Sequence, residues 1–115
     1  MKKFYYLESC TTCKRIMKEL NLADNVELRE IKSSPITAEE VDSIAAKVGS
    51  YEAMFSKRAM KYRSMGLHEK ELGESEYRRY LLEEYTFLKR PVLETDKEAA
   101  AGNSKKAVEK MKMLL

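Results

Sequence analysis

The sequence predicts an α/β fold in which a mixed four-stranded sheet carries a helical insert. A strand, a helix and a second strand follow one another near the N-terminus, helical periodicity fills the middle of the chain, and two short strands and a last helix close it. The length of 115 residues fits one domain, 1–115, with the insert at about 37–84.

The N-terminal part predicts a βαβ unit. Residues 2–7 (KKFYYL) form a short aromatic run that is typical of a buried strand. Further along, Ile16, Met17 and Leu20 recur at helical spacing, and residues 26–29 alternate as a strand does. A strand, a helix and a strand of this length form a parallel pair with a right-handed crossover.

The middle of the chain predicts helices. Thr37 and Glu40 form a capping box, and Gly49 predicts the end of the helix that they begin. The apolar stripe of that helix falls on Val41, Ile44, Ala45 and Val48. Residues 50–84 predict two or three further short helices. Their inward-facing side chains are expected to be Met54, Phe55, Met60, Tyr77, Tyr80 and Leu81.

The C-terminal part predicts a hairpin and a last helix. Residues 91–94 and 99–101 are the two strands, and residues 95–97 are the turn between them. Asn103 or Ser104 caps the helix. Its apolar face is predicted to hold Ala107, Val108, Met111 and Leu114. The complete order, βαβ, helices and ββα, is that of a thioredoxin-like sheet with a helical insert.

Composition and charge exclude several classes of protein. A chain that is 43% hydrophobic with a net charge of only +3 is globular rather than disordered, and its charge is too balanced to indicate direct nucleic-acid binding. The apolar run after Lys3 ends at Leu7, which is too short for a signal peptide or a membrane span. We therefore expect a cytoplasmic protein without a membrane partner.

The cysteine motif carries the predicted chemistry. Cys10 and Cys13, with Thr11 and Thr12 between them, lie where the first strand passes into the helix. Unpaired N–H groups and the positive end of the helix dipole favour a thiolate there, and Lys14 adds positive charge, so Cys10 is the predicted nucleophile. Cys13 lies close to one helical turn further on, so it can resolve a mixed disulfide.

Other uses of two cysteines were weighed against a redox pair. One pair is not the disulfide framework of a secreted domain. Zinc needs four ligands, which Cys10, Cys13 and the single histidine, His68, do not supply, so no metal is expected. Two inert thiols at this junction remain the alternative.

Two arginines are candidates for substrate binding. Arg90 and Pro91 precede the third strand, where a thioredoxin-type order brings the loop beside the cysteines, and their peptide bond is predicted to be cis. The Arg90 guanidinium offers a fork to an oxyanion or a carboxylate. Arg58 lies in the basic run of residues 57–63, where a substrate contact and a solvated helix face are equally open.

The sequence resembles the ArsC/Spx (arsenate reductase-like) family over nearly its whole length. The resemblance lies in residues 10–14 (CTTCK), 56–58 (SKR), 88–93 (LKRPVL) and 102–103 (GN). It implies a thioredoxin-like fold, in which Cys10 matches the family's nucleophile. The expected catalytic residues are Cys10 and Cys13, and those expected to bind substrate are Arg90, Pro91, Arg58, Thr11, Thr12 and Lys14.

The resemblance leaves two functions open. The first is a thiol oxidoreductase acting on a small oxyanion or a disulfide, with no bound cofactor. For that branch the family implies arsenate reduction linked to glutathione and glutaredoxin. The second is an Spx-like redox-sensing regulator that binds the RNA polymerase alpha subunit. Residues 97–101 lack a further oxyanion arginine, and Cys13 is typical of the Spx-like branch.

Overall fold

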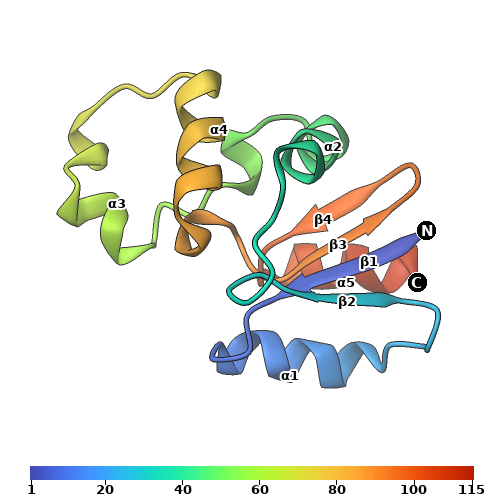
Figure 1. The fold of residues 1–115 in the computed structure, drawn as a ribbon. Coiled ribbons are helices and arrows are strands. Elements are labelled where there is room, and N and C mark those ends of the chain that lie inside the picture. Colours follow the sequence, from blue (N-terminus) through green and yellow to red (C-terminus); the bar gives the residue numbers. More distant parts are fainter. The chain divides into compact units, whose positions relative to one another are not determined.

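The structure, a computed structural model, describes all 115 residues and divides into two compact units (Figure 1). The first unit is built from Met1–Pro35 and Arg90–Leu115, and the second from Ile36–Lys89. The second unit is therefore a continuous stretch of chain inserted between the two segments of the first.

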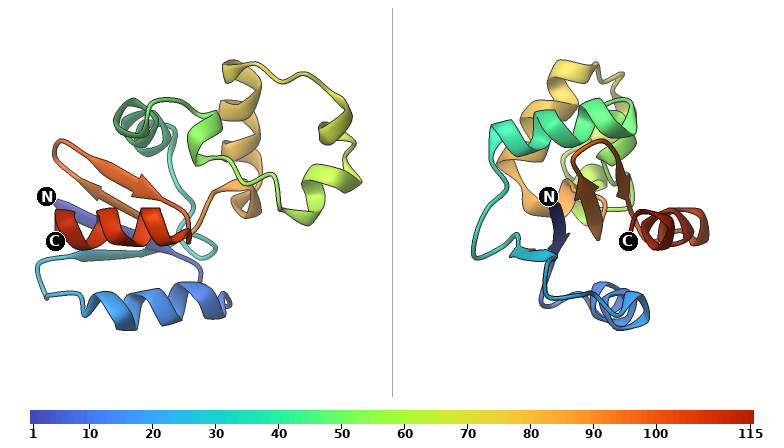
Figure 2. Two further views of the ribbon diagram at one scale, coloured as in Figure 1. Left: turned by 180° about the vertical axis from the view of Figure 1, so that it is seen from behind. Right: turned by 90° about the vertical axis from the view of Figure 1, so that its right-hand side faces the viewer.

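Four strands form the sheet of the first unit. They are β1 (Lys2–Tyr6), β2 (Glu27–Glu30), β3 (Val92–Thr95) and β4 (Ala99–Ala101). Their order is β2-β1-β3-β4, with β1 parallel to β2 and the other two pairings antiparallel (Figure 2). The predicted mixed four-stranded sheet is confirmed. The strand predicted at residues 26–29 begins and ends one residue later.

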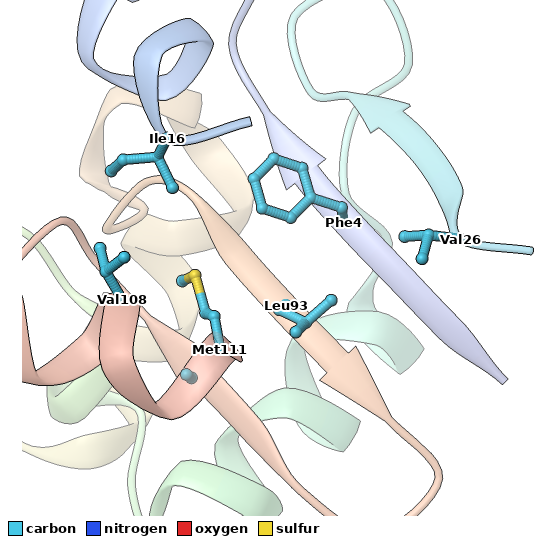
Figure 3. Close-up of a cluster of buried hydrophobic side chains, with 7 residues drawn as sticks. Phe4, Ile16, Val26, Leu93, Val108 and Met111 are labelled. Atoms are coloured by element: carbon cyan, nitrogen blue, oxygen red, sulfur yellow. The ribbon is translucent and has the colours of Figure 1, made fainter. Parts of the chain in front are cut away.

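Two helices, α1 (Thr11–Leu20) and α5 (Lys105–Leu114), bury their apolar stripes against one face of this sheet (Figure 3). The strand register supplies the other half of the core, because it places Phe4 opposite Leu93 and Leu93 opposite Ala100. Each large side chain buried in this way contributes about 1.5–3 kcal/mol. The cluster consists of Phe4, Ile16, Val26, Leu93, Ala100, Val108 and Met111.

The beginning of α5 shows which of the two predicted caps the chain uses. Ser104 is the N-cap, and its hydroxyl accepts a hydrogen bond from the backbone N–H of Ala107 at 3.1 Å. On the predicted apolar face, Val108 and Met111 are buried, whereas Ala107 and Leu114 are half-buried. Helix and sheet are therefore fixed to each other through the middle of α5.

The opposite face of the sheet contains a buried carboxylate that the sequence did not predict. Tyr5, Val92 and Ala99 are buried on this face, and Glu94 between them is only 2% exposed. The Tyr5 hydroxyl donates a hydrogen bond to Glu94 Oε1 at 3.3 Å. Lys3, which pairs with Glu94 in the strand register, places its ammonium 5.8 Å from the centre of the Tyr5 ring. Glu94 therefore has a polar neighbourhood inside the sheet.

In the second unit, α2 (Ala38–Val48) begins and ends as predicted. The Thr37 hydroxyl accepts the N–H of Glu40 at 3.2 Å, and the Glu40 carboxylate accepts the N–H of Thr37 at 2.9 Å. Gly49 ends the helix with a φ of 110°, a conformation that favours glycine. Of the predicted stripe, Val41, Ile44 and Ala45 are buried and Val48 is half-buried.

The rest of the second unit packs around aromatic rings. It contains the helices α3 (Met60–Ser64) and α4 (Glu74–Glu83) and the short 3-10 segments η1 (Glu52–Met54), η2 (Leu67–Glu69) and η3 (Tyr85–Phe87). The Phe55 ring centre lies 4.9 Å from those of both Tyr77 and Phe87, and 5.9 Å from that of Tyr62. No helix of either unit has the length and hydropathy needed to cross a membrane.

Met60 is the one predicted core residue of this region that the structure contradicts, because its side chain is 88% exposed. Tyr62 contacts the Phe55 ring instead. In a helix with 3.6 residues per turn, a residue two positions away points about 200° around the axis, so Met60 faces solvent when Tyr62 faces inward.

Candidate active site

Cys10 occupies the junction between β1 and α1. A turn follows β1, in which the N–H of Cys10 donates to the carbonyl of Leu7 at 3.0 Å. Cys10 is the N-cap of α1, with extended backbone angles of φ −91° and ψ 106°. Its Sγ accepts a hydrogen bond from the backbone N–H of Cys13 at 3.4 Å. The sulfur thus takes the position of an N-cap oxygen at the positive end of the helix dipole.

Cys13 lies one turn inside α1 and is shielded from solvent, whereas Cys10 is accessible to it. Its side chain is buried, while that of Cys10 is half-buried, and both are free thiols. The two thiols also lie close enough for each to change the pKa of the other. A reagent that approaches from solvent therefore meets the Cys10 sulfur first.

The surroundings move the two thiol pKa values in opposite directions. Partial burial acts to raise the pKa of Cys10, but hydrogen bonds from Cys13 and the Arg90 guanidinium outweigh it and lower that pKa. Burial raises the pKa of Cys13 to about 11, and the neighbouring Cys10 adds to the rise. Near neutral pH Cys10 is therefore the better nucleophile of the two.

Arg90 reaches the same sulfur from the loop before β3. Its side chain hydrogen-bonds Cys10, and its positive charge favours the thiolate. The peptide bond between Arg90 and Pro91 is cis, as the sequence predicts. Pro91 is buried, and its carbonyl accepts the N–H of Gly102 at 2.8 Å, which ties this loop to the end of β4. The fold thus brings the two predicted residues Cys10 and Arg90 together.

The remaining predicted residues of the motif lie on the first turns of α1. Thr11 is exposed and Thr12 is half-buried. The Lys14 ammonium lies 2.6 Å from Glu8 Oε1, and this ion pair raises the pKa of Lys14. The sequence predicts that Lys14 places a positive charge near Cys10. In the structure this charge is balanced by the carboxylate of Glu8.

Arg58 belongs to the second unit, where it follows η1 in an exposed turn. Its neighbour Lys57 forms an ion pair with Glu52 at 2.7 Å. The site built from Cys10, Cys13 and Arg90 consists of residues of the first unit alone.

Glu30 is a residue of this site region that sequence reasoning missed. Its Oε2 accepts the N–H of Glu8 at 2.9 Å, and its Oε1 accepts the N–H groups of Lys32 at 3.0 Å and Ser33 at 2.7 Å. These hydrogen bonds lower the pKa of Glu30 to about 2. The sequence carries no signal for this role, because it depends on the register that pairs Tyr6 with Glu30 and puts the end of β2 beside the loop that leads to Cys10.

An open hollow lies beside that loop. It is lined by Glu8, Ser9, Glu30, Lys32 and Ser33. Ser9 is the residue next to Cys10 in the chain. Its charged lining is two carboxylates and one ammonium.

The chain brings no three metal-ligating side chains together. Two thiols alone do not complete the tetrahedral set of four ligands that structural zinc takes.

A sheet that presents a thiol at the start of its first helix to a cis-proline loop on the next strand is a thioredoxin-like fold. The ArsC family model matches residues 5–111 of the sequence. The chain belongs to the ArsC family.

Solved structures support the same fold. An ArsC family related protein from Bacteroides fragilis has a TM-score of 0.78 at 23% identity, over 96% of each chain. An arsenate reductase from Vibrio cholerae has a TM-score of 0.78 at 16% identity, over 95% of each chain. A Staphylococcus aureus protein has a TM-score of 0.74 at 26% identity, over 96% of this chain and 97% of its own. The comparison with curated proteins gives no match.

Proposed function

We propose that the protein is a thiol-dependent oxidoreductase in which Cys10 is the nucleophile and Cys13 the resolving thiol. The observation that carries this proposal is that the pKa of Cys10 is lowered while the pKa of Cys13 is raised. Cys10 is therefore the thiol that is ready to attack, and Cys13 stays protonated until it resolves the mixed disulfide.

The proposed reaction transfers two electrons. The Cys10 thiolate attacks one sulfur of a substrate disulfide, forms a mixed disulfide and releases the other half as a thiolate. Cys13 then loses its proton and attacks Cys10 Sγ, which releases the second substrate thiolate. The substrate disulfide becomes two thiols, and the protein gains one disulfide between Cys10 and Cys13.

Arg90 supports this chemistry in two ways. Its positive charge favours the Cys10 thiolate before the attack. Once the sulfur has formed a bond and lost its charge, the guanidinium can hold a carboxylate or an oxyanion of the substrate, which it matches as a fork. Arg90 therefore binds the substrate at the moment when the mixed intermediate forms.

A small oxyanion is the alternative substrate of the same site. Arsenate would take two electrons from two thiols, which become a disulfide while one oxygen leaves as water. In this scheme glutathione, with or without glutaredoxin, supplies the electrons that restore the Cys10 and Cys13 thiols. The relatives described as arsenate reductases support testing this substrate on the chain.

A turnover assay tests the proposal. The purified chain is incubated with glutathione, glutaredoxin, glutathione reductase and the reduced cofactor of that reductase. Cofactor consumption with a disulfide or with arsenate is measured, and the rate of the same mixture without the chain is subtracted. We expect turnover that Cys10→Ser abolishes and Cys13→Ser strongly reduces. Activity that survives Cys10→Ser would overturn the proposal.

The high pKa of Cys13 favours a second candidate function. With a pKa of about 11, little of the Cys13 thiol is ionised at pH 7, so closure of the disulfide is slow unless something assists it. A slow single closure suits a redox switch. An Spx-like regulator would then show disulfide formation without turnover, and would bind the RNA polymerase alpha subunit in a redox-dependent pull-down.

A further inference from the structure

We propose that Glu8 is a specificity-determining residue of the cysteine site. By holding the Lys14 ammonium it leaves no surplus positive charge for a dianionic substrate, and the site takes disulfides without negative charge beside the sulfur. This inference rests on the proposed thiol–disulfide function and names the substrate class of the same site.

The position of Glu8 is fixed by its backbone. Its N–H donates to Glu30 Oε2 at 2.9 Å, and Glu30 is itself held by the N–H groups of Lys32 and Ser33. Two residues further on, the N–H of Cys10 closes the turn onto the Leu7 carbonyl. The carboxylate of Glu8 thus projects from a braced turn that leads directly into the nucleophile.

Lys14 is the cation whose charge Glu8 neutralises. Residues four apart lie on the same face of a helix, so Lys14 lies one turn above Cys10 on the same side of α1. A free ammonium there would attract an anionic reagent to the sulfur. The ammonium is instead bound by Glu8 Oε1 at 2.6 Å, and this contact raises the pKa of Lys14.

The charges around Cys10 show what the pairing achieves. Arg90 balances the Cys10 thiolate, and Glu8 balances Lys14. The hollow beside the loop adds the Glu30 carboxylate and the Lys32 ammonium, which offset each other. With Glu8 paired to Lys14, these charges balance, so a dianion meets no surplus positive charge here.

Stability alone does not account for the ion pair. The side chains of Lys14 and Glu8 are 51% and 61% exposed, and pairs so exposed contribute little to folding. In this proposal the pair acts instead on the charge that an approaching reagent meets, because each charge acts over several ångströms.

The experiment compares three symmetrical aliphatic disulfides: cystamine, a dication; 2-hydroxyethyl disulfide, which is neutral; and 3,3′-dithiodipropionate, a dianion. The rate at which each forms a mixed disulfide on Cys10 is measured by mass spectrometry with the full chain at low salt. Each rate is divided by the wild-type rate for the same reagent, so that differences in leaving-group chemistry cancel.

For Glu8→Gln we expect faster reaction with the dianion, slower reaction with the dication and no change with the neutral disulfide. The selectivity between the two charged reagents should change about threefold to tenfold, and the change should vanish in high salt. Lys14→Gln should shift the selectivity in the opposite direction. The double variant Glu8→Gln, Lys14→Gln should return close to the wild type.

Glu19→Gln is the matched control. Glu19 lies on α1, as Lys14 does, and forms an exposed ion pair with Lys112 of α5 at 2.8 Å. It should leave the selectivity unchanged. Equal selectivity in the wild type and in both single variants would overturn the role of Glu8. Failure of Cys10 to react with any of the three reagents in the wild type would instead overturn the proposed function. If one single variant does not fold, the other still decides the question.

Discussion

Cys10 and Cys13 have the same side chain, and their different chemistry comes from where α1 places each of them. At the N-cap, the Cys10 sulfur receives a backbone N–H and the Arg90 guanidinium, while one turn later Cys13 is buried. Near neutral pH the first is a ready nucleophile, and the second needs a base or an altered environment before it can attack.

Alkylation should follow this difference. Because the pKa of Cys10 is lowered, its reactive thiolate persists to lower pH, whereas the Cys13 thiolate appears only as pH approaches about 11. Iodoacetamide labelling followed by peptide mass spectrometry across pH 6–11 should therefore show Cys10 reacting first. Equal labelling rates at pH 7 would be inconsistent with the assigned roles.

Arg90 has a separate test. Replacing it with alanine removes a positive charge and a hydrogen-bond donor from the thiolate, so the pKa of Cys10 should rise. Arg90→Lys keeps the charge but loses the bidentate fork, so it should recover part of that pKa shift without restoring the binding of an anionic substrate. The pH dependence of Cys10 alkylation measures the first effect, and substrate KM measures the second.

At the scale of elements, the caps and the strand order could be predicted from the sequence, whereas the strand register and the packing of single side chains could not. The capping box of Thr37 and Glu40 lies within four residues, so it could be predicted, and the cis bond before Pro91 followed from the strand order. Glu30 could not be found in this way, because its partners depend on the register between β1 and β2. The exposure of Met60 depends on which neighbour enters the aromatic core.

Glu30 should contribute to stability through the loop that it braces. Its pKa falls from an ordinary 4.5 to about 2 in the folded chain, so its contribution is full above about pH 4.5 and is lost as pH falls towards 2. Glu30→Gln should lower the free energy of unfolding by about 1–2 kcal/mol at pH 7, because charge-assisted hydrogen bonds to backbone N–H groups are lost.

Urea unfolding at pH 7 and at pH 3 measures this effect. The difference between wild type and Glu30→Gln should shrink at the lower pH, where the wild-type carboxylate begins to gain its proton. Glu27→Gln, on the same strand and paired with Lys3 at 3.5 Å, is the control and should have a smaller effect. A variant Glu30→Gln as stable as the wild type at pH 7 would show that the loop does not depend on this carboxylate.

At the scale of the whole molecule, the cysteine site belongs to a unit that is made of two separate segments of the chain. Cys10 and Cys13 come from the segment Met1–Pro35, and Arg90 from the segment Arg90–Leu115, with the second unit inserted between them. The pairing of β1 with β3 brings the two segments together, so the site depends on long-range contacts of the sheet.

Trapping the mixed disulfide tests the order of the two sulfurs most directly. The reduced full chain, Cys13→Ser and Cys10→Ser are each treated with one equivalent of 2-hydroxyethyl disulfide and followed by intact mass spectrometry. We predict a stable adduct on Cys10 in Cys13→Ser, little adduct in Cys10→Ser, and in the wild type an adduct that gives way to a monomer lighter by two hydrogens. Adduct formation on Cys13 in Cys10→Ser at the wild-type rate, or wild-type protein that forms only intermolecular dimers, would contradict the account.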